Sequence, residues 1–240
     1  MLPTLVGLTA AAAAAATAAG YQTMSPTGQW YGRTFAGGQR GTKQIALTFD
    51  DGPNGPHTLK LLEVLAKHGV KATFFMIGSY VRQQPEIARA VAQGGHVIGN
   101  HTFSHPRLIF KTAEETRAEL VECRSALQDA IGVHSNLFRP PFGGRRPATL
   151  RVARDLGLQT VMWNVSGEDW KAPTAEAIEN EVARQIRGGD VVLLHDGSHR
   201  GMGAERTRTV AATEGLIPRL RDQGYAFVTV EEMHAISDQL

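Results

Sequence analysis

The chain has little cysteine and almost no excess of charge of either sign. Cys123 is the only cysteine in 240 residues, so no intrachain disulfide can form. It lies within a helical pattern, where we expect a buried, unreactive thiol. The formal net charge of +2 gives no electrostatic basis for nucleic-acid binding, and no DNA- or RNA-reading motif or internal repeat occurs. Hydrophobic residues make up 42% of the chain, enough for one sizeable core.

Residues 2–19 lack charge altogether and include seven consecutive alanines at 10–16. The length suits a secretory signal or a short anchor, but the usual basic residues do not precede the segment. We expect residues 1–20 to form this signal or anchor, residues 21–42 a linker and residues 43–240 the folded domain. Export or membrane association in the cell envelope is therefore favoured. A soluble alanine-rich helix in a cytoplasmic protein is the alternative.

Apolar runs alternate with helical patterns from Lys43 onward. Thr112 and Glu115 have the spacing of a capping box that begins a long helix. Glycines follow five helical patterns where left-handed C-caps would lie, at Gly69, Gly94, Gly157, Gly188 and Gly224. Strands are predicted at residues 45–49, 72–77, 96–100, 137–139, 159–163, 191–195 and 226–230. This alternation predicts a parallel α/β fold, but periodicity does not separate an open sheet from a barrel.

Two adjacent carboxylates, Asp50 and Asp51, end the first apolar run. Neighbouring side chains within a strand face opposite ways, but the turn at Gly52 and Pro53 interrupts this alternation. Both carboxylates can then face one cleft. A metal-dependent hydrolase uses such a pair, one carboxylate to hold a cation and one to accept a proton from water. For this segment alone, a solvated surface turn is the alternative.

Two histidines, His101 and His105, are spaced i and i+4, which is one helical turn. With one carboxylate they make a set of three metal ligands that leaves positions open for water and substrate. Further polar segments end later apolar runs, namely Arg139-Pro140-Pro141-Phe142-Gly143, Asp169-Trp170 and Leu193-Leu194-His195-Asp196. In the last of these, Leu193 and His195 share one strand face, so Asp196 is expected to support the site from outside it.

These five segments, in this order, resemble the motifs of the NodB-homology polysaccharide deacetylases, carbohydrate esterase family four. The resemblance covers roughly residues 44–231. It implies an irregular (β/α) barrel with about seven parallel strands. In such a barrel the site lies at the carboxyl ends of the strands, where all five segments are expected.

The resemblance implies a metal site and an acid–base pair. Asp51, His101 and His105 match the ligands of one divalent metal, for which we expect Zn²⁺, with Co²⁺, Ni²⁺ or Mn²⁺ as alternatives. The resemblance also implies four catalytic residues. Asp50 corresponds to the general base and Arg139 to the residue that pairs with it. His195 corresponds to the general acid and Asp169 to the residue that orients His195.

Three further positions match the substrate cleft of the family. The backbone N–H of Phe142 corresponds to a donor for the oxyanion. Members often carry tyrosine there, so this chain lacks that hydroxyl group. Trp170 and Leu193 correspond to a small apolar pocket for the acetyl methyl group. Two other histidines, His57 and His199, lie after the first and fifth motifs and are weaker candidates for the cleft.

The sequence therefore predicts a metal-dependent hydrolase that removes N-acetyl groups from N-acetylglucosamine-type units of a glycan. Peptidoglycan, chitin oligomers and exopolysaccharide all present this group. The same scaffold acting on a formyl amide or an O-acetyl ester is the main alternative. A phosphoesterase would need more carboxylates. A non-catalytic carbohydrate-binding domain would be expected to lack a catalytic residue, and all four are present.

Overall fold

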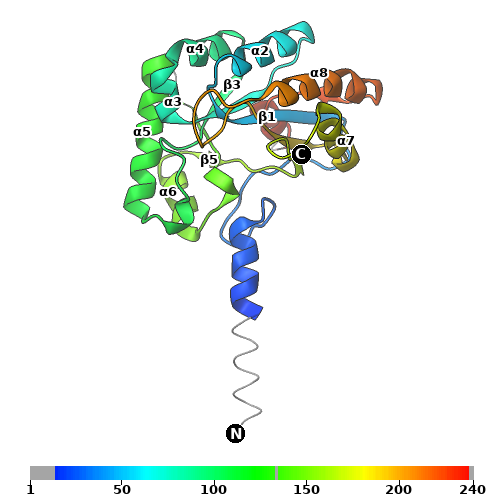
Figure 1. The fold of residues 1–240 in the computed structure, drawn as a ribbon. Coiled ribbons are helices and arrows are strands. Elements are labelled where there is room, and N and C mark those ends of the chain that lie inside the picture. The colour runs from blue at the N-terminus through cyan, green and yellow to red at the C-terminus, as the bar shows by residue number, and fades with distance from the viewer. Residues whose placement is uncertain (1–13, 133–134, 238–240) are drawn as a thin grey trace.

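Strands and helices alternate along the chain in the computed structural model, which describes residues 14–132 and 135–237 (Figure 1). The strands are β1 (Gln44–Gly52), β2 (Thr73–Met76), β3 (Val97–Asn100), β4 (Leu137–Phe138), β5 (Gln159–Thr160), β6 (Val165–Ser166), β7 (Asp190–His195) and β8 (Ala226–Phe227). The helices are α2 (His57–Lys67), α3 (Gly78–Gln83), α4 (Pro85–Gln93), α5 (Ala113–Ile131), α6 (Pro147–Asp155), α7 (Ala175–Gln185), α8 (Thr207–Asp222) and α9 (Val230–Ser237), with short 3-10 turns η1 (Leu108–Phe110) and η2 (Pro141–Gly143).

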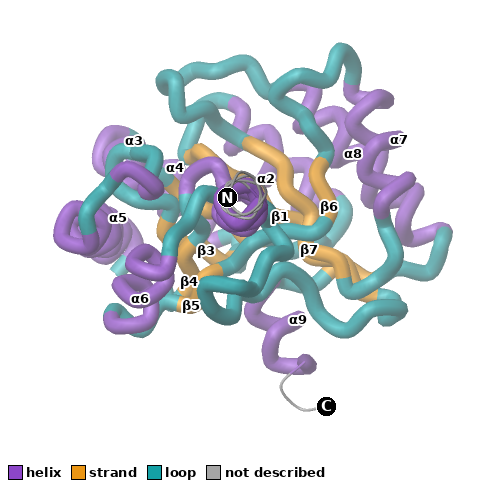
Figure 2. Tube along the Cα trace, turned by 90° about the horizontal axis from the view of Figure 1, so that it is seen from below, coloured by secondary structure: helices purple, strands orange, loops and turns teal. Residues whose placement is uncertain are grey.

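The strands form one curled sheet in the order β5-β4-β3-β2-β1-β7-β6, with β8 beside β1. Every paired strand in this sheet is parallel. Figure 2 shows the strands in the middle with helices on both sides. The predicted irregular (β/α) barrel is confirmed. All seven predicted strands are present, and the two-residue strand β6 was not predicted because two residues carry no periodic signal.

The central strand β1 is buried on both faces, as expected in a parallel sheet covered by helices. Ile45, Leu47 and Phe49 pack into the main core with the surrounding helices. Ala46 packs on the opposite face, in a second cluster inside the curl of the sheet. The alternation places even-numbered residues of β1 inside the curl, so Asp50 is directed there by its position in the strand.

Local signals in the sequence set several helix boundaries. The capping box at Thr112 and Glu115 is present at the start of α5, with both reciprocal hydrogen bonds. Four of the five predicted glycine caps are left-handed, at Gly69, Gly157, Gly188 and Gly224. The exception is Gly94, which is right-handed, and the next residue, Gly95, takes the left-handed position with φ 73°. Cys123 lies fully buried on α5, as predicted, and burial raises the pKa of its thiol to about 12.

Residues 25–42, which lie between an N-terminal helical segment and β1, pack along the domain. Residues 14–24 are helical and project from the domain in Figure 1. Phe35 bridges Val161 beside β5, and Gly37 bridges Asp190 at the start of β7. Arg145, between η2 and α6, holds the residues that follow the helical segment, because its buried guanidinium donates to the carbonyls of Ser25 and Gly28. Residues 1–13 of the predicted signal or anchor lie outside the described residues. Within the described ranges, no helix has the length and apolar character needed to cross a membrane.

Candidate active site

A cavity of about 550 Å³ lies at the carboxyl ends of the strands and receives residues from all five motifs. Eight of the ten predicted site residues line it, namely Asp50, Asp51, His101, His105, Phe142, Trp170, Leu193 and His195. The other two, Arg139 and Asp169, are buried behind it and contact the lining residues. The structure therefore brings together segments that are up to about 145 residues apart in the chain.

Asp51, His101 and His105 form a group with the geometry of a metal site. One ligand atom from each lies within 4.8 Å of the others, and all three residues are buried. The Asp51 Oδ1 atom is 3.4 Å from His101 Nε2 and 3.1 Å from His105 Nε2, yet it has no hydrogen-bond partner among the described residues. A cation between these three atoms would satisfy the buried oxygen, so the donor set fits a divalent metal.

A bulge in β1 turns Asp51 toward this group. By alternation Asp51 would face the helices with Phe49, but the pairing with β2 shifts between Asp50 and Gly52. Asp51 also has a left-handed backbone, with φ 71°. Burial alone would raise the pKa of Asp51, but the surrounding imidazoles of His101, His105 and His199 lower it well below its usual value. Its carboxylate is therefore held in the charged form that a metal requires.

The two histidines of this group lie on a loop after β3 and not on a helix, so the helical spacing expected from the sequence is wrong. Thr102 and His105 are left-handed, with φ 66° and 58°. The His105 N–H donates to Thr102 Oγ1 at 3.0 Å. Glu119 of α5 holds the middle of the loop, because its carboxylate accepts from the N–H groups of Phe103 and Ser104. The two imidazoles converge through this loop geometry.

Asp50 forms a buried pair with Arg139. The guanidinium NH1 donates to Asp50 Oδ1 at 2.7 Å and to Thr48 Oγ1 at 2.7 Å. The other nitrogens donate to main-chain carbonyls, with NH2 2.9 Å from Met162 O. Burial lowers the pKa of Arg139, and the neighbouring Asp50 counteracts this effect. The second oxygen of Asp50, Oδ2, lies 3.7 Å from His101 Nε2 and thus beside the metal site.

His195 and Asp169 form a second pair at the cavity, where His195 on β7 is the register partner of Asp50 on β1. His195 Nδ1 is 2.8 Å from Asp169 Oδ1, and the His195 N–H donates to Asp169 Oδ2 at 2.8 Å. Thr209 of α8 also donates to Oδ2, at 2.8 Å. Burial lowers the pKa of His195, but the Asp169 carboxylate outweighs it and raises the value to about 9. A histidine held protonated in this way can donate a proton near neutral pH.

Apolar side chains form part of the cavity wall. Trp170 stands edge-on to His195 at 5.2 Å between ring centroids, and Leu193 is 4% exposed beside it. Phe142 is left-handed, with φ 57°, and its ring packs on His105 at 4.7 Å. Trp163, which the sequence did not single out, also lines the cavity and lies over Arg139.

The two weaker histidine candidates have different outcomes. His199 lines the cavity, and its N–H donates to Asp51 Oδ2 at 3.1 Å. His57 begins α2 and does not line the cavity, although its Nε2 atom lies 3.7 Å from Oε2 of Glu205, which does. Asp196 faces away from the cavity, as predicted, and accepts a hydrogen bond from Thr58. The sequence analysis did not identify Glu119, because nothing in its helical segment indicates a contact with the loop at Ser104, 15 residues earlier.

All non-glycine residues with positive φ in the described ranges belong to the motif segments or directly precede one. They are Asp51, Thr102, His105, Phe142 and Glu168. A left-handed conformation of this kind costs on the order of 1 kcal/mol or more per residue and persists where the surrounding structure enforces it. Strain is therefore concentrated around the cavity, as is common at functional sites.

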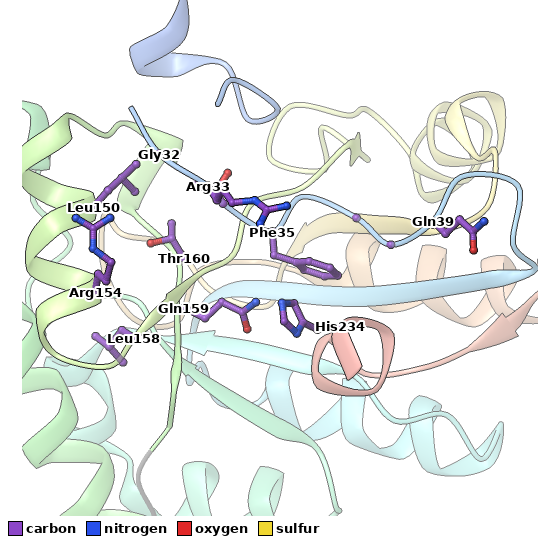
Figure 3. Close-up of a pocket in the computed structure, with 13 residues that line it drawn as sticks. Gly32, Arg33, Phe35, Gln39, Leu150, Arg154, Leu158, Gln159, Thr160 and His234 are labelled. Atoms are coloured by element: carbon purple, nitrogen blue, oxygen red, sulfur yellow. The ribbon is translucent and has the colours of Figure 1, made fainter. Parts of the chain in front are cut away.

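A second, larger cavity of about 700 Å³ lies away from the motifs, between residues 32–39, α6, β5 and α9 (Figure 3). Arg33, Arg154 and Gln159 line it, and the ring of Phe35 meets His234 at 4.9 Å. None of the predicted site residues contributes to it. Cavity size alone therefore does not locate the catalytic chemistry.

Comparison with known proteins places this geometry in a family. A family model described as polysaccharide deacetylase matches residues 37–161. A peptidoglycan-N-acetylglucosamine deacetylase of Bacillus cereus is 39% identical over 193 residues, covering 80% of this chain and 88% of its own length. A chitooligosaccharide deacetylase of Sinorhizobium fredii is 36% identical over 210 residues, covering 85% and 98%.

Solved structures agree with the sequence relatives. The Bc1960 peptidoglycan N-acetylglucosamine deacetylase superposes with a TM-score of 0.79 at 35% identity, covering 83% of this chain and 92% of that one. A CE4 family pseudoenzyme, BA3943 from Bacillus anthracis, superposes with a TM-score of 0.78 at 28% identity, covering 84% and 68%. The fold thus occurs both in enzymes and in a pseudoenzyme. The chain belongs to the polysaccharide deacetylase family, carbohydrate esterase family four.

Proposed function

We propose that the protein is a metal-dependent N-deacetylase of N-acetylglucosamine-type units in a glycan. The main supporting observation is that the group of Asp51, His101 and His105 shares one cavity with Asp50 of the Asp50–Arg139 pair and His195 of the His195–Asp169 pair. The relatives named above are deacetylases of peptidoglycan and of chitooligosaccharides. Retention of every paired catalytic residue favours an enzyme over a pseudoenzyme.

The residues divide the reaction between them. A divalent cation, for which we propose Zn²⁺, would be held by Asp51, His101 and His105 and would polarise the acetyl carbonyl while acidifying water. Asp50 accepts a proton from the attacking water, and Arg139 holds its carboxylate in place. The N–H of Phe142 donates to the carbonyl oxygen as negative charge develops on it.

The second pair, His195 and Asp169, then assists the cleavage of the amide bond. His195 donates a proton to the nitrogen that leaves as the amine, and Asp169 holds the imidazole in the charged state for that step. Trp170 and Leu193 enclose the acetyl methyl group. The products are acetate and a free amino sugar, and the proton given by His195 is replaced by the one that Asp50 removed from water.

We also propose that this activity is located in the cell envelope, with residues 1–20 as the segment that directs or anchors the domain. The support is the uncharged stretch at residues 2–19 and the name of the peptidoglycan-acting relatives. Fractionation of cells that express the chain with and without residues 1–20 tests this. Recovery of both forms in the same compartment would contradict it.

The test of the activity is acetate release from N-acetylglucosamine oligomers by metal-free protein, with and without added Zn²⁺, beside the Asp50→Asn variant. We expect Zn²⁺-dependent release that the variant lacks, although the variant still binds Zn²⁺ and the oligomer. Release of formate from formylated oligomers, or of acetate from O-acetylated ones only, would instead support action on another acyl group. Binding of oligomers without any release would indicate a carbohydrate-binding protein.

A further inference from the structure

The two histidine ligands of the metal group are held in different ways. A histidine that binds a metal usually donates its other ring N–H to a carbonyl or carboxylate, which fixes the ring. His101 follows this pattern, with Nδ1 2.8 Å from the Arg139 carbonyl oxygen. The Nδ1 atom of His105 is buried and has no hydrogen-bond partner among the described residues. Another contact must therefore orient His105.

Aromatic rings surround His105 where that hydrogen bond is lacking. The His199 ring lies nearly parallel to it, with centroids 4.9 Å apart and planes at 16°. The Phe142 ring stands edge-on to His105 at 4.7 Å and 74°. Phe142 and His199 also contact each other, at 4.9 Å and 77°. Stacked and edge-to-face arrangements at these distances are favourable, so the three rings hold one another in place.

The backbone of His199 contacts a second member of the metal group. Its N–H donates to Asp51 Oδ2 at 3.1 Å, and its ring Nδ1 lies 3.7 Å from the same oxygen. With Oδ2 held by this contact, Oδ1 is the atom of Asp51 that faces the Nε2 atoms of His101 and His105. The same residue thus contacts two of the three metal-site side chains.

The loop that carries His199 is itself fixed to the barrel. Tyr80 of α3 donates to the Ser198 carbonyl at 3.0 Å. Asn54, just after β1, donates to the carbonyls of Asp196 at 2.8 Å and Ala204 at 2.9 Å. In Figure 1 this is the orange loop that leads into α8. The position of His199 is therefore set by contacts at both ends of its loop.

We propose that His199 is a positioning residue of the metal site. Its ring orients His105 by stacking, in place of the hydrogen bond that His105 lacks, and its N–H orients Asp51. His199 is not itself a ligand, since the group of mutually close ligand atoms consists of Asp51, His101 and His105. The proposal concerns metal affinity. It rests on the metal site of the proposed function and not on which glycan is the substrate.

The test is the Zn²⁺ affinity of the metal-free protein, measured by competition with a chromophoric chelator. We expect His199→Ala to weaken Zn²⁺ binding by about 10- to 100-fold, the usual effect of removing a group that orients a ligand. His199→Phe keeps a ring for stacking and the backbone N–H, so its affinity should stay within about threefold of the unaltered protein. Met202→Ala changes an exposed, uncharged residue of the same loop that does not line the cavity, and serves as the matched control.

A second readout separates positioning from general damage. The visible spectrum of the Co²⁺-loaded protein reports ligand geometry, and we expect it to change in His199→Ala and to be restored in His199→Phe. Equal Zn²⁺ affinity in His199→Ala and the unaltered protein would overturn the proposal. So would an equal loss in His199→Phe or in Met202→Ala, because the ring of His199 would then not be the cause. Failure of the unaltered protein to bind Zn²⁺ would overturn the metal site itself.

Discussion

Arg139 and Asp50 form a fully buried ion pair in which NH1 and Oδ1 are 2.7 Å apart. The same guanidinium reaches Thr48 Oγ1 at 2.7 Å and the Met162 carbonyl at 2.9 Å. It also lies over the ring of Phe75, with 4.1 Å from Cζ to the centroid. Only a planar group with several fixed donors can make these contacts together. Arg139 therefore fixes the proposed base from behind the cavity.

Replacing Arg139 by lysine is expected to destabilise the protein and impair activity. A lysine keeps the charge but cannot satisfy Thr48, Asp50 and the Met162 carbonyl at once, which leaves buried groups unpaired. We expect the free energy of unfolding of the metal-free protein to fall by about 3 kcal/mol in urea denaturation. Arg151→Lys, an exposed change on α6, should shift it by less than about 0.5 kcal/mol. Equal effects of the two changes would contradict this role.

The pair of His195 and Asp169 predicts the alkaline limit of activity. The pKa of His195 is raised to about 9, so the protonated acid is present below that value and kcat/KM should fall as pH rises through about 9. In Asp169→Asn the carboxylate that raises this pKa is gone, while burial still lowers it. The alkaline limb should then move toward lower pH by at least about one unit. A limb at the same pH in both proteins, measured at saturating Zn²⁺, would show that His195 is not the titrating acid.

Glu119 should control metal affinity although it touches no metal ligand side chain. Its carboxylate accepts hydrogen bonds from the N–H groups of Phe103 and Ser104, in the loop between His101 and His105. Glu119→Ala is expected to weaken Zn²⁺ binding by roughly tenfold, because the loop loses these anchors. Glu122→Ala on the same helix removes only an exposed pair with Arg82 and should leave Zn²⁺ affinity unchanged. Chelator competition measures both, and equal affinities in the two variants would exclude this role for Glu119.

A methyl group at Gly197 should disturb the same site. A Cβ added there would overlap the carbonyl oxygen of Asp51, and backbone atoms cannot easily move aside. Gly197→Ala is expected to lower the free energy of unfolding by about 1–3 kcal/mol and to weaken Zn²⁺ binding. Gly20→Ala, where the added carbon meets nothing within 4 Å, is the control and should be neutral or slightly stabilising. Unchanged Zn²⁺ affinity in Gly197→Ala would mean that Asp51 tolerates the displacement.

Local signals account for the parts of the fold that the sequence predicted. The capping box of Thr112 and Glu115 and the glycines after helices act within a few residues, so they are readable from the chain. The order of the five motifs gave the family and thereby the barrel, which periodicity alone could not distinguish from an open sheet. Strand β6 was missed because it owes its pairing to neighbouring strands and not to its own two residues.

The details of the site depend on contacts that the chain does not display locally. The bulge at Asp51 and the left-handed turn at His105 set the direction of both proposed ligands, whereas the sequence indicated a helical spacing for the histidines. His199 reaches Asp51 across 148 positions, and Arg145 reaches Ser25 across 120. Neither contact joins residues at a short spacing that could be recognised in the sequence. Contacts between distant segments therefore determine which polar residues near a motif contact the site.

The most direct test of the proposed mechanism is a titration of metal-free protein with Zn²⁺ while acetate release from N-acetylglucosamine oligomers is followed. The group of Asp51, His101 and His105 predicts that activity rises in proportion to added Zn²⁺ and levels off at about one ion per chain. The His101→Ala variant should release no acetate at this Zn²⁺ level. Full activity in the metal-free protein, or an undiminished rate in His101→Ala, would contradict the metal-dependent deacetylase proposed here.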